Sequence, residues 1–206
     1  MVQANAALTG LSGIVSGGGG GGGPTTVLQD NFVDANTTPL QSHTMNVGPG
    51  WTIDKGTFQI NNNKAQCTAT GSSPAGARAH SDAGKSDVTL SMIFNGNIGG
   101  GGNGGAVLRY TDENNFWFLN LSNTALVLYE RSGGAWTQRG ISSGTFTNST
   151  DYTLQIVASG ANLTATLNSG NTITYNSATS NQTVTTHGIS AGFVADTFSN
   201  FLATNP

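Results

Sequence analysis

The chain has 206 residues, of which 36% are hydrophobic and only 8% are charged, with a formal net charge of −3. This length fits one domain with a tail. The absence of a Lys/Arg cluster argues against nucleic acid as a partner. No run of 18 apolar residues occurs, so we expect no membrane insertion.

The N-terminal segment differs in composition from the rest of the chain. Seven consecutive glycines, Gly17 to Gly23, are typical of a linker because glycine loses the most backbone entropy on ordering. Residues 1–15 contain no Lys or Arg, so we expect no secretory signal there. We therefore predict an N-terminal arm over residues 1–26 and a globular domain over residues 27–206. Five apolar residues of the arm are candidates for docking onto another protein chain, and the alternative is a free tail: Val2, Leu8, Leu11, Ile14 and Val15.

From residue 26 onwards, short segments alternate apolar and polar residues, with turn sequences between them. The clearest alternation is Val88, Leu90, Met92 and Phe94. Strands are predicted over residues 26–32, 56–60, 65–70, 87–94, 106–110, 116–121, 126–131, 152–158, 163–167, 172–175 and 187–194. No segment has a helical period. Many short strands with one buried face each predict an all-β fold of two antiparallel sheets packed as a sandwich.

One stretch carries a family resemblance. Residues 105–118, Gly-Ala-Val-Leu-Arg-Tyr-Thr-Asp-Glu-Asn-Asn-Phe-Trp-Phe, resemble the central hairpin of laminin-G-like domains in the concanavalin A-like lectin/glucanase superfamily. Further segments fall in the expected order, from Asp30-Asn31-Phe32 to Phe198-Ser199-Asn200-Phe201. The resemblance implies a jelly roll over about residues 27–201. It leaves function open, because lectins, glycosidases, adhesion modules and viral coat components share this fold.

The resemblance also bears on cofactors. In some relatives, a carboxylate in the closing strand helps to hold calcium, but this chain has Ser199 where many relatives have Asp. Asp30 and Asp196 are the remaining calcium candidates, although Ca²⁺ takes six to eight oxygen ligands. We expect no metal site from them and no other cofactor.

Catalysis is not expected from the acidic residues. A glycosidase needs two carboxylates on either side of the scissile bond. The chain has two glutamates, Glu113 in a turn and Glu130 beside Arg131, and neither follows the glucanase pattern Glu-x-Asp-x-x-Glu. We interpret Glu130 and Arg131 as a solvated pair, and the single cysteine, Cys67, as a buried structural thiol.

Sugar binding requires an exposed aromatic ring with polar groups beside it. Trp136 follows Ser132-Gly133-Gly134-Ala135, a sequence typical of a hairpin tip, so we expect its ring to be exposed. Trp136, Tyr129 and Arg109 form the candidate ligand set. Trp51 and Trp117 are predicted to be structural.

The combination of a lectin-like sandwich, an apolar arm, a polyglycine run and very few charges resembles bacteriophage virion decoration or tail accessory proteins. On this interpretation the protein is a non-enzymatic structural component at the virion surface. Its arm binds other virion proteins, or copies of the chain form a homo-oligomer. The alternative is a carbohydrate-binding, lectin-like module that recognises glycans outside the cell or on a cell surface.

Overall fold

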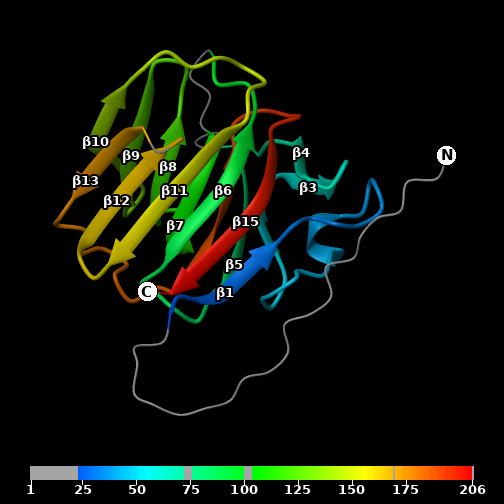
Figure 1. The fold of residues 1–206 in the computed structure, drawn as a ribbon, viewed down its shortest axis with the longest axis horizontal. Helices are drawn as coiled ribbons and strands as arrows, with labels where there is room; N and C mark the ends of the chain where they lie inside the picture. Colours follow the sequence, from blue (N-terminus) through cyan, green and yellow to red (C-terminus); the bar gives the residue numbers. More distant parts are fainter. Residues whose placement is uncertain (1–22, 72–75, 100–103, 169, 206) are drawn as a thin grey trace, which may run out of the picture.

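The computed structural model describes residues 23–71, 76–99, 104–168 and 170–205. In these residues two antiparallel sheets pack face to face, and the one helical segment is a short 3-10 turn, η1 (Leu40–Ser42). Figure 1 shows one sheet in front of the other. This is the all-β jelly-roll sandwich that the sequence predicts.

The front sheet in Figure 1, called sheet A, has eight strands. Their order is β13-β12-β11-β6-β15-β4-β3, and β1 also pairs with β15. The first and last strands of the domain are therefore hydrogen-bonded neighbours. The strands of sheet A are β1 (Thr25–Asp30), β3 (Thr57–Ile60), β4 (Ala65–Ala69), β6 (Thr89–Asn95), β11 (Tyr152–Ser159), β12 (Asn162–Leu167), β13 (Asn171–Tyr175) and β15 (Thr197–Asn205).

The second sheet, sheet B, has seven strands in the order β10-β9-β8-β7-β14-β5-β2. Four successive strands, β7 to β10, are joined in three hairpins and form one half of it. The strands of sheet B are β2 (Thr52–Lys55), β5 (Ala77–Asp82), β7 (Gly104–Asp112), β8 (Asn115–Leu121), β9 (Ala125–Ser132), β10 (Ala135–Ser143) and β14 (Thr186–Ala191).

The core between the sheets follows from the period of two in the strands. In β6 and β11 the apolar residues are paired across the ladder, Leu90 with Ile156 and Met92 with Leu154, and all four are buried. Side chains directly opposite each other on one face pack together. Each such side chain stabilises the fold by about 1.5–3 kcal/mol through burial.

The predicted strands are confirmed to within a few residues of each end, and β1 begins at Thr25, inside the predicted arm. Four strands are absent from those predicted by alternation: β2, β5, β10 and β15. The hairpin turn expected before Trp136 and the closing segment of the resemblance, residues 198–201, anticipate β10 and β15. Strand β10 has no buried face, and β5 is buried on both faces with small or polar residues, so neither alternates in hydrophobicity. Strand β2 is a short edge strand with an irregular register.

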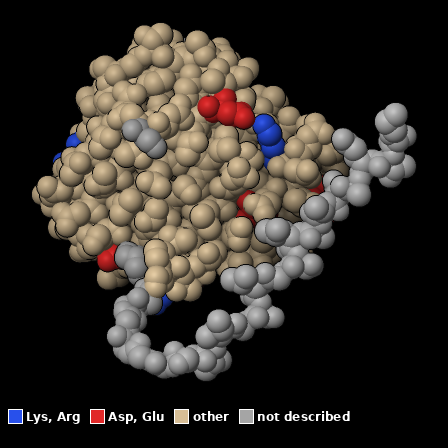
Figure 2. Space-filling model, viewed as in Figure 1, with Lys and Arg blue, Asp and Glu red and all other residues tan. Residues whose placement is uncertain are grey.

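The low charge content is visible on the molecular surface. Most of the face in view in Figure 2 consists of uncharged residues. No helix in the described residues has the length and apolar character needed to cross a membrane.

Candidate functional site

The outer face of sheet B carries a second apolar cluster, separate from the core. In β8, Trp117 and Leu119 point into the core between the sheets, whereas Phe116 and Phe118 lie on the opposite face. An outward face with large buried aromatics is unusual for a sheet that faces solvent on one side. The rings that meet there are called the aromatic face below: Tyr110, Phe116, Phe118, Tyr129 and Trp136.

Trp136 is the exposed member of the aromatic face. It follows the β9–β10 turn and pairs with Arg131 across the hairpin. Its ring centroid lies 5.5 Å from that of Phe116, 6.2 Å from that of Phe118 and 5.8 Å from that of Tyr129. Trp136 is 36% exposed, whereas Phe116 and Phe118 are buried. The inner rings therefore support Trp136 from below and leave its outer surface to solvent.

Two arginines lie against these rings. The Arg131 guanidinium carbon is 4.8 Å from the Trp136 ring centroid. The Arg78 guanidinium carbon is 4.9 Å from the Phe116 ring and 5.8 Å from the Tyr110 ring. Strand β5, which carries Arg78, is separated from β8 by β14 and β7, a distance of about 14 Å at ordinary strand spacing. Side chains from strands on either flank of β8 therefore meet on the same face of sheet B.

Two glycines on the intervening strands let neighbouring strands approach closely. They are Gly105 on β7 and Gly188 on β14. A Cβ added at Gly105 would lie 2.0 Å from the Leu119 carbonyl oxygen, and one at Gly188 would lie 2.0 Å from the Ala79 carbonyl oxygen. Only glycine fits at either position.

Several buried polar atoms of this face have no hydrogen-bond partner in the described residues. Asp54 pairs with Arg78, with 3.2 Å between its Oδ2 and the arginine Nε. Burial raises the pKa of Tyr110, and nearby Asp54 raises it further. Leaving a buried donor or acceptor without a partner costs about 1–3 kcal/mol, so such groups are uncommon. Six buried atoms here have no hydrogen-bond partner in the described residues: Arg78 Nη1, Tyr110 Oη, Asn120 Oδ1, Arg131 Nε, Arg131 Nη1 and Ser190 Oγ.

The structure brings together two of the three residues in the candidate ligand set. Trp136 and Tyr129 are neighbours on the aromatic face, but Arg109 is fully buried elsewhere. Sequence reasoning missed Arg131 and Arg78 as members of this face. The hairpin register places Arg131 directly opposite Trp136, a signal already present in the sequence. Arg78 lies on a strand that the hydrophobic pattern did not reveal.

Arg109 holds parts of the fold together. Its Nε donates to the Ser86 carbonyl, and its Nη2 donates to Asp87 and to the Gly160 carbonyl in the β11–β12 turn. The residue has a φ of 50°, in the left-handed region that L-residues rarely adopt. Arg109 thus ties sheet B to sheet A.

His187 is hydrogen-bonded to the backbone of Arg109. The Arg109 backbone N–H donates to His187 Nδ1, and the Lys85 carbonyl lies 2.9 Å from Nε2. A neutral ring protonated on Nε2 satisfies both contacts. Burial lowers the pKa of His187 to about 4, so the neutral ring is the stable form at neutral pH.

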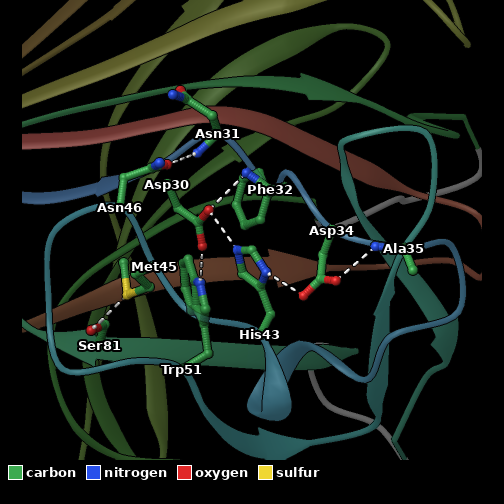
Figure 3. Close-up of polar contacts among 10 residues, drawn as sticks. All are labelled: Asp30, Asn31, Phe32, Asp34, Ala35, His43, Met45, Asn46, Trp51 and Ser81. Atoms are coloured by element: carbon green, nitrogen blue, oxygen red, sulfur yellow. Dashed lines mark hydrogen bonds and ion pairs between the residues drawn. The ribbon is translucent and has the colours of Figure 1, made fainter.

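A different buried polar network lies where β1 ends (Figure 3). Asp30 accepts hydrogen bonds from the Trp51 indole (2.6 Å) and the Phe32 backbone N–H (2.7 Å), and it contacts His43 Nε2 at 2.9 Å. His43 Nδ1 contacts Asp34 at 3.2 Å. The pKa of Asp34 is lowered by the hydrogen bond from the Ala35 backbone N–H and by His43. This network fixes the segment between the first two strands.

The two calcium candidates are engaged by protein donors in separate places. Asp30 belongs to the network just described, and Asp196 accepts backbone hydrogen bonds from Asn97, Gly192 and Phe193. Burial raises the pKa of Asp196 despite these bonds. No group of three or more His, Cys, Asp or Glu side chains in the described residues is arranged to hold a metal ion.

Cys67 lies beside Asp196 and is buried, as predicted. Its backbone N–H donates to the Asp196 carbonyl. Burial raises the pKa of the Cys67 thiol to about 11, and the Asp196 charge adds to this. A thiol with such a pKa is unreactive at neutral pH.

The expected pairing of Glu130 with Arg131 is wrong. Residues adjacent in a strand point to opposite faces. Glu130 instead binds Arg139 on the neighbouring strand, with 2.7 Å between Oε2 and Nε, and this bond raises the pKa of Arg139. Glu113 is exposed at the β7–β8 turn. The buried Trp51 and Trp117 are structural, as predicted.

The predicted docking residues Val2, Leu8, Leu11, Ile14 and Val15 lie outside the described residues. Their role stays a prediction from sequence.

Comparisons with known proteins address the fold. No protein-family model matches the sequence, and no curated protein does so. The structure is similar to the carbohydrate-binding module CBM66 from Bacillus subtilis, with a TM-score of 0.58 and 16% identity, over 77% of this chain and 97% of that one. It is also similar to domain 4 of AbnA, a GH43 extracellular arabinanase from Geobacillus stearothermophilus, in complex with arabinotriose. There the TM-score is 0.59 with 8% identity, over 88% of this chain and 93% of that one.

A third similar structure is a mutant of the GH43 protein BlXynB from Bacillus licheniformis, with a TM-score of 0.60 and 14% identity. The match covers 85% of this chain but only 39% of that one. At these identities the likenesses show the fold alone, a lectin-like jelly roll.

Proposed function

We propose that the chain is a non-catalytic carbohydrate-binding module of lectin type that binds its ligand on the aromatic face of sheet B. The observation that carries this proposal is the position of Trp136. Its exposed ring is supported by Phe116, Phe118 and Tyr129 and lies beside buried polar atoms without partners.

The chemistry of this face suits a sugar. A pyranose or furanose ring has an apolar surface of C–H groups, which stacks on an aromatic ring, and hydroxyl groups, which need hydrogen-bond partners at the edge. Trp136 and Tyr129 offer the stacking surface. Tyr110, Asn120 and Ser190 offer the hydrogen-bonding atoms.

The similar structures support the same class of function. One is named as a carbohydrate-binding module, and another was solved with arabinotriose bound. These names describe those proteins, and they support a sugar as the class of ligand to test first.

A glycan array followed by calorimetric titration tests the proposal. We expect the full chain to bind a defined subset of glycans, and Trp136→Ala to weaken that binding by about 30-fold, the effect of losing a central aromatic anchor. The matched control is Val194→Ala, which removes an exposed apolar side chain from the turn before β15, away from the aromatic face. Equal binding by the wild type and Trp136→Ala would place the ligand elsewhere. A failure to bind any glycan would remove the proposal.

We make a separate proposal for the arm, which is compatible with sugar binding. On the sequence features alone, residues 1–23 dock the module onto a bacteriophage virion, as a decoration or tail accessory protein at the particle surface. The comparisons do not bear on this proposal. Deletion of residues 1–23 is expected to leave sugar binding intact and to abolish incorporation into the particle, and full incorporation of the deleted chain would contradict it.

A further inference from the structure

We infer that the aromatic face selects sugars that carry a carboxylate, and that Arg131 binds this group. The inference rests on the proposed function and names the class of ligand that the same face takes. It follows from the state of the Arg131 guanidinium.

Arg131 differs from the other three arginines of the chain. Arg78, Arg109 and Arg139 each form an ion pair, with Asp54, Asp87 and Glu130 respectively. Within the described chain, no carboxylate lies within ion-pair distance of Arg131, although 93% of its surface is covered.

The hydrogen-bonding groups of Arg131 are also free. Its Nε and Nη1 have no partner in the described part of the chain, and its Nη2 reaches only Asn114 Oδ1, at 3.4 Å. Nε and Nη2 are neighbouring donors in one plane, a geometry that matches the two oxygens of a carboxylate, and only the long contact with Asn114 occupies Nη2. Buried charges are normally paired. An unpaired, buried guanidinium beside an exposed Trp is therefore a site that can bind an anion.

The charge of Arg131 is not neutralised by a carboxylate of the described chain. The Trp136 ring lies over its guanidinium in a cation–π contact. Burial lowers the pKa of Arg131, nearby Arg78 lowers it further, and Glu113 opposes this. Asp54 pairs with Arg78, and Glu113 is exposed and outside ion-pair distance, so the excess positive charge of this face belongs to Arg131.

Trp136 is the partly exposed side chain that packs on the Arg131 guanidinium. The ring that contacts the guanidinium belongs to a partly exposed side chain beside the hairpin turn, so a change of its rotamer would open a path to Arg131. A sugar that stacks on Trp136 and Tyr129 as the indole turns outward brings its carboxylate to Nε and Nη2, where it replaces the long contact of Nη2 with Asn114 Oδ1. The neutral part of the sugar and its acid group are then recognised by adjacent side chains.

The test compares each acidic sugar with its methyl ester, which has nearly the same shape and no charge. Titrations of the full chain with tetragalacturonate, with sialyllactose, with the methyl ester of each and with neutral galactotetraose separate a hexuronate from a nonulosonate as the source of the carboxylate. We expect at least one acid to bind about tenfold or more tightly than its ester, an advantage that shrinks as salt is raised. In Arg131→Gln the acid and the ester should bind equally, and Arg131→Lys should retain part of the preference because it keeps the charge but loses the fork.

Equal binding of acids and esters by the wild type, or binding of neutral sugars alone, would overturn the inference and leave the proposed function standing. Binding of no sugar, here or on the array, would remove both. The comparison of acid and ester needs no variant, so it decides the matter even if Arg131→Gln does not fold.

Discussion

Two buried polar clusters of this molecule differ in whether their polar atoms have hydrogen-bond or ion-pair partners. At the end of β1, the Asp30 carboxylate contacts three donors or ring nitrogens and His43 contacts a carboxylate at each ring nitrogen. On the aromatic face, Arg131 has two buried nitrogens without a partner in the described residues. Both clusters combine charge with aromatic rings, but the first is complete within the chain and the second lacks an acceptor.

The difference separates groups that stabilise the fold from groups that are available to a ligand. A satisfied network gains its full hydrogen-bond energy on folding, so removing one member leaves its partners buried and unpaired. An unsatisfied group has cost stability already, and a ligand that supplies the missing partner recovers that cost. Four changes test this contrast.

The largest expected effect is on the satisfied network. Asp30→Asn removes the charge that His43 and Trp51 contact, so the free energy of unfolding should fall by about 3–5 kcal/mol. Urea denaturation followed by Trp fluorescence measures it. The control Asp151→Asn, at an exposed carboxylate, should change stability by about 0.5 kcal/mol or less. A loss at Asp30 no larger than that of the control would contradict a structural role for this network.

The pH dependence of stability tests a second satisfied group, His187. Its pKa in the folded chain is about 4, below the ordinary value of 6.5, so the unfolded chain takes up a proton first as pH falls. The contribution of the neutral His187 ring to the free energy of unfolding is fully present above pH 6.5. It is lost as the pH falls towards 4, by about 3 kcal/mol in total. Unfolding free energies measured between about pH 7.5 and pH 4 should slope less in His187→Gln than in the wild type. His80→Gln, at a half-buried histidine, is the control with a smaller expected change.

The third effect separates binding from stability on the aromatic face. Trp136→Ala should lower the free energy of unfolding by about 1 kcal/mol, the ordinary cost for a residue outside the core. The fully buried Trp117 gives the matched comparison, since Trp117→Ala should cost about 3–5 kcal/mol. Sugar binding should show the reverse order, measured on folded protein at low temperature. A Trp136→Ala variant as unstable as Trp117→Ala would make Trp136 a core residue.

The smallest expected effect has the opposite sign. Arg131→Met replaces an unpaired buried cation by an apolar side chain of similar length, so stability should stay unchanged or rise by about 1 kcal/mol, although a cation–π contact is lost. Thermal unfolding measures this. A large loss of stability would show that Arg131 is satisfied within the chain and would weaken the contrast with Asp30.

Much of the fold was predictable because alternation in strands such as β6 and β11 reports one buried face directly. Strands β5 and β10 show no alternation for opposite reasons: the first is buried on both faces and the second on neither. Hydrophobic periodicity has no signal in either case.

The candidate site was predictable only in part, for a local reason. A period of two would place Val107 with Arg109, and Leu108 with Tyr110. The irregularity in β7 at Arg109 shifts this phase, so Tyr110 joins Val107 on the outer face and the Arg109 side chain turns to Ser86 and Asp87. An irregularity of this kind is set by tertiary contacts, which the sequence pattern does not report.

The most direct test of sugar binding on the aromatic face uses the three tryptophans of the chain. The indole N–H of Trp51 is bonded to Asp30, that of Trp117 is bonded to the Ser180 carbonyl, and Trp136 is exposed on the aromatic face. A nitrogen–proton correlation spectrum, recorded while the best array glycan is added, follows all three indoles at once. The account predicts a saturable shift of the Trp136 signal with the Trp51 and Trp117 signals unmoved. A Trp136 signal that stays in place while the glycan binds would contradict it.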